Sequence, residues 1–448
     1  MLAGAVAALA TLQGAAVVLA APASADSVRT TQQWVLDALN VQPAWAITQG
    51  KGVEVAVIDS GVDADVSDLV GSVRTGPDLT GVHTSTTNKY WGVHGTWMAS
   101  LIAGHGHGPD GEDGIIGIAP QSTVLSIRVI TDVHDPNFKK YEHEPAAKSQ
   151  GELATAIRYA VSSGASVISM SLGYSMPSAV VRAALQDAYQ HNVFVVASAG
   201  NSGNAAGASG KGQAPYSFPA DYPGVLAVGA VNQAGQPASF SSENLSVQVA
   251  APGYQVPAQG RDGGYWLVSG TSPACALTAG VAALIKAEYP RLTDEQVSEA
   301  ITSSTTPGTR PAGRYDDLVG FGEVNAGDAM TAAARLARPA KPAVAMAAAG
   351  HFGGGSAAIP AAPVQPRGRQ ALLLYCVLGL ASLTLIAVAV SRLFALRDRQ
   401  LGRPEIVPEA HYGVRIHATP PGRHAAPRSR AESGSAEPAG PGNGDALQ

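Results

Sequence analysis

The sequence predicts an α/β domain in which a mainly parallel, twisted sheet lies between two layers of helices. Short runs of apolar and β-branched residues alternate along the chain with amphipathic segments of helical period. The run Val53–Asp59 (VEVAVID) is almost wholly apolar and ends in a carboxylate, which is typical of a strand buried on both faces of a parallel sheet. Alternation of strand and helix requires right-handed crossovers, and these cover both faces of the sheet with helices.

Further strands and helices follow from the same patterns. The other predicted strands share short length and β-branched, apolar composition: Val124–Val129, Val167–Leu172, Val193–Ala197 and Leu226–Val231. The predicted helices are Leu153–Ser163, which Gly164 ends, and Ala179–His191. In folds of this kind functional side chains gather at the carboxyl ends of the strands, so polar residues at those ends are the candidates for chemistry.

The composition fits one large domain with accessory segments. The chain has 448 residues, of which only 14% are charged, whereas average soluble domains have about 25%. Apolar or low-complexity segments therefore dilute the charge. The formal net charge of −5 is small for this length and lacks the basic character of nucleic-acid-binding domains. Nucleic acid is therefore not expected as a partner.

The amino terminus has the features of a secretory signal peptide. Residues 1–25 are small and apolar, and they end in the small-x-small sequence Ala23-Ser24-Ala25. No Lys or Arg precedes the apolar run. An uncleaved anchor, or a start codon placed too far downstream, would explain this departure, but we favour cleavage after Ala25. Residues 26–40 then form a short extension before the main domain, residues 41–335.

A second apolar block, residues 371–390, predicts a transmembrane helix. Twenty residues at 1.5 Å each span about 30 Å, the thickness of a bilayer core. A buried core helix is the alternative, but residues 336–370 before the block are rich in Ala, Pro and Gly and form a linker without a core. Arginines are more numerous after the block (392, 397, 399 and 403) than before it (367 and 369). The positive-inside rule then predicts a cell-membrane protein with an extracytoplasmic domain and a disordered cytoplasmic tail, residues 391–448.

Three polar residues stand where catalytic groups are expected. Asp59 ends the first predicted strand, His94 opens an apolar helix, and Ser272 enters a helix of small residues. Each has an ordinary alternative explanation. Asp59 alone fits a turn or helix cap, His94 a core or capping residue, and Ser272 a plain N-cap. At that position, however, the Ser272 hydroxyl also lies at the positive end of a helix dipole.

Together these residues supply what nucleophilic catalysis needs. A serine is a weak nucleophile until a base accepts its proton, and the base needs a carboxylate to orient it. The developing oxyanion needs donors as well. Asn201 follows the strand Val193–Ala197 and can be one donor, and the backbone N–H of Ser272 can be the other. Loss of one such donor typically costs about 10²–10³ in rate.

The motifs around these residues resemble the subtilisin superfamily. They are DSG at 59–61, HGT at 94–96, SAGN at 198–201 and GTS at 270–272, in the superfamily's order along the chain. The resemblance implies a three-layer subtilisin-like domain and a serine endopeptidase that forms an acyl-enzyme. Asp59 would orient His94, the general base, and Ser272 would attack. Substrate-binding residues follow by the same resemblance: Ser171, Leu172 and Gly173 along the extended substrate, and Ala199 and Gly200 in the primary specificity pocket.

Within this superfamily the layout is similar to that of the mycosins, membrane-anchored proteases of type VII secretion systems in actinobacteria. Residues 26–40 are too short for the folded inhibitory pro-domain of secreted subtilisins, and residues 130–150 stand where mycosins carry an inserted loop. The chain departs from mycosins in lacking disulfides in its protease domain and in having Pro-Ala-Cys after Ser272. The resemblance implies polypeptide substrates, a membrane and a type VII complex as partners. A structural stabiliser of that complex, with dispensable protease activity, is the alternative function.

No cofactor is expected from the sequence. Calcium is common in the superfamily, but the acidic residues Asp110, Glu112 and Asp113 lack the ligand spacing of a calcium site. His105 and His107 come without the further ligands of a zinc site. We therefore assign no metal site, and a structural calcium ion without an identifiable site stays open as an alternative.

Overall fold

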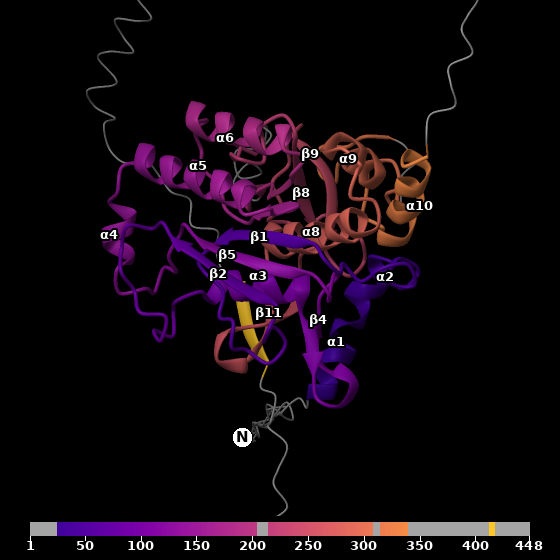
Figure 1. Ribbon diagram of the computed structural model, residues 1–448, viewed down its shortest axis with the longest axis horizontal. Coiled ribbons are helices and arrows are strands. Elements are labelled where there is room, and N and C mark those ends of the chain that lie inside the picture. The colour runs from indigo at the N-terminus through magenta and orange to yellow at the C-terminus, as the bar shows by residue number, and fades with distance from the viewer. Residues whose placement is uncertain (1–24, 204–213, 308–313, 339–411, 417–448) are drawn as a thin grey trace, which may run out of the picture.

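The computed structural model describes residues 25–203, 214–307, 314–338 and 412–416. Its centre is a seven-stranded sheet in the order β2-β5-β1-β6-β7-β8-β9, in which each neighbouring pair is parallel. Helices cover both faces (Figure 1). The predicted three-layer α/β architecture is confirmed.

All five predicted strands are present, with ends shifted by one or two residues. They are β1 (Glu54–Asp59), β5 (Thr123–Arg128), β6 (Val167–Met170), β7 (Phe194–Ser198) and β8 (Val225–Val231). The sequence analysis missed β2 (Val73–Asp78) and β9 (Val247–Pro252), which are the two edges of the sheet. Strand β2 has the sequence VRTGPD and no buried residue, so it lacks the apolar pattern that marks the central strands.

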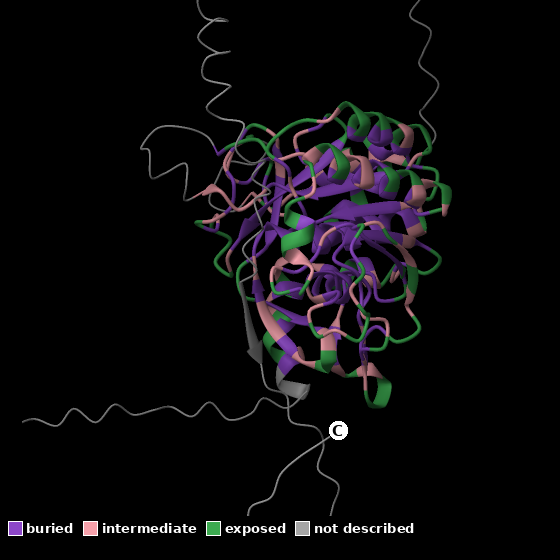
Figure 2. Ribbon diagram, turned by 90° about the vertical axis from the view of Figure 1, so that its left-hand side faces the viewer, coloured by how far each residue is buried: buried purple, intermediate pink, exposed green. Residues whose placement is uncertain are grey.

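The central strands bury both of their faces, as their apolar composition predicted. In β1, Val55 and Val57 point into the core beneath α3 and α8, whereas Ala56 and Ile58 point into the core beneath α5 and α6. This alternation follows from the two-residue period of a strand. Figure 2 shows the buried residues concentrated in the central strands and the exposed ones on outer helix faces and loops.

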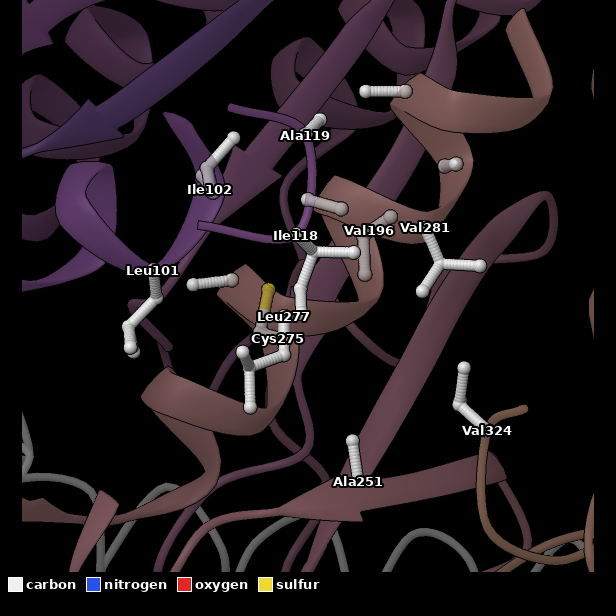
Figure 3. Close-up of a cluster of buried hydrophobic side chains, with 14 of the residues drawn as sticks. Leu101, Ile102, Ile118, Ala119, Val196, Ala251, Cys275, Leu277, Val281 and Val324 are labelled. Atoms are coloured by element: carbon white, nitrogen blue, oxygen red, sulfur yellow. The ribbon is translucent and has the colours of Figure 1, made fainter. Parts of the chain in front are cut away.

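The two helix layers are built from different parts of the chain. One layer contains α3 (Val93–Ala103) and α8 (Thr271–Glu288), with α9 (Asp294–Thr302) and α10 (Ala326–Leu336) beside them. The other contains α5 (Ala146–Ser162) and α6 (Ala179–Gln190), with the short α4 (Phe138–Glu142) before them. Helix α5 begins seven residues before its prediction, because its first two turns are polar and carry no apolar period. Figure 3 shows Leu101 and Ile102 of α3 near Ile118, Cys275 and Leu277.

The amino-terminal extension packs on the protease domain as part of the same core. Helix α1 (Ala25–Ala38) is followed by α2 (Val41–Trp45), and Val35, Leu36 and Leu39 belong to the main hydrophobic core. Gln32 Nε2 donates a hydrogen bond to the Ile116 carbonyl oxygen at 2.7 Å, and Gln32 Oε1 accepts one from the Ile116 N–H at 3.0 Å. The amino-terminal extension therefore shares its hydrophobic core with the residues that follow it.

Two small antiparallel sheets complete the described structure. Strands β3 (His105–His107) and β4 (Asp113–Ile116) form a hairpin, and β10 (Val256–Gln259), β11 (Tyr265–Ser269) and β12 (Tyr412–Ile416) form a three-stranded sheet. Strand β12, yellow in Figure 1, lies in residues 391–448, the segment predicted to be a cytoplasmic tail, and pairs with β11. Its sequence YGVRI has a strand's alternation, and it pairs with the edge of β11 that β10 does not occupy.

Several predicted segments cannot be compared with the structure. The signal peptide, apart from Ala25, and the transmembrane segment at residues 371–390 lie outside the described residues, as do residues 339–370 of the predicted linker and the predicted tail apart from residues 412–416. Among the helices that are described, none has the length and apolar composition needed to cross a bilayer.

Candidate active site

Asp59 and His94 form a buried hydrogen-bonded pair. Asp59 is the last residue of β1, and both of its carboxylate oxygens lie near Nδ1 of His94, at 2.8 and 2.9 Å. The two residues are only 1% and 3% exposed. Because an ionised carboxylate only accepts hydrogen bonds, this contact places the imidazole proton on Nδ1 and leaves Nε2 with the lone pair. The pair therefore has the geometry of an oriented general base.

Ser60 and Gly95 bring the start of α3 against the end of β1. The Ser60 N–H donates to Asp59 Oδ1 at 2.6 Å, and the Gly95 N–H donates to Ser60 Oγ at 3.0 Å. A Cβ atom on Gly95 would lie 2.1 Å from the carbonyl oxygen of Gly61, so no residue with a side chain fits there. The HGT motif is thus explained by packing as well as by chemistry: glycine lets His94 approach Asp59.

Ser272 lies in the first turn of α8, at the same edge of the sheet. It is 3% exposed, and its carbonyl oxygen accepts a hydrogen bond from Ser171 Oγ at 3.2 Å. Ser171 follows β6, and β6 is the direct neighbour of β1. Because α8 also packs against α3, the helix starts that carry Ser272 and His94 both lie at the carboxyl ends of these strands.

Asn201 lies directly beside the residue that precedes Ser272. Its Oδ1 accepts hydrogen bonds from the backbone N–H of Thr271 at 2.9 Å and from Thr271 Oγ1 at 3.1 Å. The backbone N–H can only donate, so the amide oxygen must face Thr271 and the amide NH₂ group must point elsewhere. Asn201 therefore presents donors, not an acceptor, on its other side. This is the orientation that an oxyanion donor needs.

The five predicted substrate-binding residues follow two adjacent strands. Ser171, Leu172 and Gly173 come after β6, and Ala199 and Gly200 come directly after β7, which pairs with β6 in parallel register. Leu172 and Ala199 are buried, whereas Gly173 and Gly200 are partly exposed. The structure therefore brings these two segments to one place beside Ser272.

The sequence analysis missed Ser217, which lies between these two segments. Tyr174 and Phe218 exchange backbone hydrogen bonds of 2.7 and 2.9 Å, which fix Ser217 beside Gly173. A Cβ atom on Gly173 would lie 2.1 Å from Ser217 Oγ, and one on Gly200 would lie 3.4 Å from Ser217 Cβ. The hydroxymethyl group of Ser217 thus lies between both glycines. No motif marks this serine, because its place depends on a bridge between distant segments.

Asp221 holds the backbone of Ser217 in this position. The Ser217 N–H donates to the Asp221 carboxylate, and the Asp221 N–H donates back to the Ser217 carbonyl oxygen at 3.0 Å. Burial raises the pKa of the Asp221 carboxyl, and the hydrogen bonds that it accepts from Ser246 and Ser217 oppose that rise. Ser217 is therefore fixed from two sides, by Asp221 and by the Tyr174–Phe218 bridge.

Comparison with known proteins shows the family to which this chain belongs. Residues 50–322 match the Subtilase family (peptidase S8). A subtilisin of Bacillus pumilus is 34% identical over 259 residues, which cover 57% of this chain and 85% of the subtilisin. Subtilisin E of Bacillus subtilis is also 34% identical, but the chain spans only 61% of its length.

Mycosins are similar over a longer part of the chain. Mycosin-1 of Mycobacterium tuberculosis is 34% identical over 340 residues, which cover 66% of this chain and 73% of the mycosin. The solved structure of the MycP3 protease from the type VII (ESX-3) secretion system has a TM-score of 0.56 and 32% identity, with 66% of this chain and 87% of that chain covered. The chain belongs to the subtilase family and is a subtilisin-like serine peptidase related to the mycosins.

Proposed function

We propose that this protein is a membrane-anchored, extracytoplasmic serine endopeptidase that cleaves polypeptides with Asp59, His94 and Ser272. The observation that carries the proposal is the buried Asp59–His94 pair, 2.8 Å apart, at the sheet edge where the helix of Ser272 begins. A carboxylate-oriented imidazole next to a serine at a helix start is the arrangement that activates a serine nucleophile. The catalytic groups in the proposed reaction are all side chains or backbone groups of this chain.

The proposed reaction has two halves. His94 Nε2 accepts the proton of Ser272 Oγ as that oxygen attacks the peptide carbonyl carbon, and the resulting imidazolium is stabilised by Asp59. Asn201 Nδ2 and the Ser272 N–H donate hydrogen bonds to the oxyanion. His94 then protonates the leaving amine, which leaves an acyl-enzyme on Ser272. Water attacks this ester with His94 again as the base, and Ser272 is regenerated.

The contacts of Ser217 suggest which substrates fit. Extended substrate pairs with the backbone of residues 171–173, and the side chain before the scissile bond enters the space between Gly173 and Gly200. Because Ser217 lies against both glycines, this space accepts a small side chain such as that of alanine and excludes an aromatic ring. We therefore propose exported polypeptides with a small residue before the cleaved bond as the substrate class.

A second candidate function comes from the relatives. MycP1 is described as a serine protease and an essential component of the type VII (ESX-1) secretion system. By analogy, this chain would stabilise a secretion complex at the membrane, and its peptidase activity would be dispensable. The two functions differ in what they require of Ser272, so one substitution separates them.

The Ser272→Ala variant tests the peptidase function. We expect the purified protein to react with a fluorophosphonate probe and to cleave peptides. The variant should not be labelled, and its kcat should be lower by a factor of about 10⁴–10⁶. Mass spectrometry should place the label on Ser272. Equal labelling of both proteins, or none of the wild type, would refute the proposal. In a strain that lacks the gene, full rescue by the Ser272→Ala variant would instead favour the stabiliser function.

Removal of the Ser217 side chain tests the substrate class. We expect Ser217→Gly to raise the ratio of kcat/KM for a phenylalanine substrate to that for an alanine substrate by about tenfold or more, since one carbon group in a pocket is worth about 10–200-fold. The two peptides should differ only in the residue before the cleaved bond. Ser175→Gly is the matched control, because Ser175 is exposed in the same segment. An unchanged ratio would show that Ser217 does not limit this space.

The membrane topology can be tested by cysteine labelling in intact cells. If residues 371–390 cross the membrane, the tail lies opposite the protease domain and β12 cannot pair with β11 in the inserted protein. In a Cys376→Ser background we expect an impermeant maleimide to label Thr87→Cys, which is exposed on the domain, but to label Ser435→Cys only after permeabilisation. Labelling of both cysteines in intact cells would contradict this topology and would allow the β11–β12 pairing.

A further inference from the structure

Arg128 is a fully buried cation at the sheet edge that carries the catalytic pair. It is the last residue of β5, and in the parallel register it is the direct partner of Asp59 in β1. Its side chain is 2% exposed, and it is the largest of the fully buried side chains among the described residues. Burial of a guanidinium group is unfavourable unless its donors are matched by acceptors. The positions of those acceptors therefore indicate what the arginine holds together.

The Arg128 guanidinium group binds three separate segments of the chain. Nε donates to the carbonyl oxygen of Ser60 at 3.1 Å. Nη1 donates to Asp78 Oδ2 at 2.7 Å, at the end of β2, and to Thr80 Oγ1 at 3.0 Å, just after that strand. Nη2 donates to Asp135 Oδ2 at 3.2 Å, in the inserted segment of residues 130–150. The planar fork of an arginine suits such simultaneous contacts better than the single ammonium group of a lysine.

Ser60 connects this arginine to the Asp59–His94 pair. Its N–H donates to Asp59 Oδ1 at 2.6 Å, and its Oγ accepts the N–H of Gly95, the residue after His94, at 3.0 Å. Its carbonyl oxygen is the group that Arg128 holds. A rotation of the Ser60 turn would therefore disturb the carboxylate and the start of α3 together. In active sites a displacement of about 1 Å can cost 10²-fold in rate.

Asp135 brings the inserted segment into the same network. Its side chain is fully buried, and its Oδ1 accepts hydrogen bonds from Thr84 Oγ1 and from the N–H of Asn137, both at 2.8 Å. The other oxygen binds Arg128. The conformation of the inserted segment and that of the turn after Asp59 are thus joined through one guanidinium group.

We propose that Arg128 is a positioning residue of the protease: it holds the Ser60 turn, and through it the Asp59–His94 pair, in register with the inserted segment. This inference rests on the proposed peptidase function. The hydrogen-bond partners of Arg128 are Ser60, Asp78, Thr80 and Asp135, and none of them is a reacting group of the proposed mechanism. Its substitution should therefore change the rate of the chemical step and leave substrate binding nearly unchanged. A purely structural arginine would affect only the amount of folded protein.

The test compares Arg128→Met and Arg128→Lys with Arg74→Met in the full chain. Arg74 is the matched control, since its exposed guanidinium binds Glu54 at 2.6 Å at the opposite end of β1. Active sites are counted by fluorophosphonate titration, so that rates refer to folded protein. We expect Arg128→Met to lower kcat per active site about 10–100-fold, with KM within about twofold of wild type. Arg128→Lys should fall in between, and Arg74→Met should match wild type.

The pH dependence of kcat/KM is a second measurement, and a lower amount of folded protein would not change its shape. With the Ser60 turn released, Asp59 stabilises protonated His94 less well, so the acidic limb of kcat/KM for Arg128→Met should shift to lower pH. If that variant does not fold, Asp135→Asn and Arg128→Lys decide the question, with expected losses in kcat of about threefold to tenfold. Wild-type kcat and pH profile in the folded Arg128 and Asp135 variants would overturn the proposal. Since wild-type labelling is measured in parallel, this failure is distinct from a failure of the peptidase function.

Discussion

The contact between Asp59 and His94 is the constraint on which the site depends. Two carboxylate oxygens within 2.9 Å of one imidazole nitrogen, in a buried position, fix both the ring orientation and its tautomer. A buried carboxylate is unfavourable without partners. The Ser60 N–H and the imidazole N–H supply them. The surrounding structure therefore has to deliver a strand end, a tight turn and a helix start to one point.

The parallel sheet delivers them. Because β1, β6 and β7 are adjacent and parallel, the segments that follow them begin at one edge. Asp59 is the last residue of β1, Ser171 comes after β6, and Asn201 comes after β7. The first turn of α8 places Ser272 at the same edge of the sheet. Glycine at position 95 allows a contact that no other residue would allow. The short sequence motifs therefore depend on the packing of strands and helices from most of the domain.

The sequence was sufficient for the central strands and for the polar residues at their ends. A strand that is buried between two helix layers accepts almost only apolar residues. A continuous apolar run such as VEVAVID therefore identifies such a strand from the sequence alone. The edge strand β2 was missed because it is exposed and contains Gly and Pro. The early start of α5 was missed because its first turns are polar. In these elements tertiary contacts determine the structure.

The residues that the sequence analysis missed have their roles through contacts between distant segments. Ser217 reaches Gly173 only through the bridge between Tyr174 and Phe218. In the sequence Arg128 is one residue of a predicted strand, and only the fold brings Ser60, Asp78 and Asp135 to its side chain. The strand β12 depends likewise on the free edge of β11. None of these relations leaves a spacing pattern in a single sequence.

The most direct test of the central claim is the rate at which the Asp59→Asn protein reacts with a fluorophosphonate. An asparagine amide at this position keeps the shape of the carboxylate but lets the imidazole adopt the other tautomer, in which Nε2 carries the proton and cannot act as base. If Asp59 orients His94, the rate of Ser272 phosphonylation should fall by about 10³–10⁴, with the unfolding transition close to that of wild type. A decrease of less than about tenfold in a folded variant would contradict the assignment of Asp59.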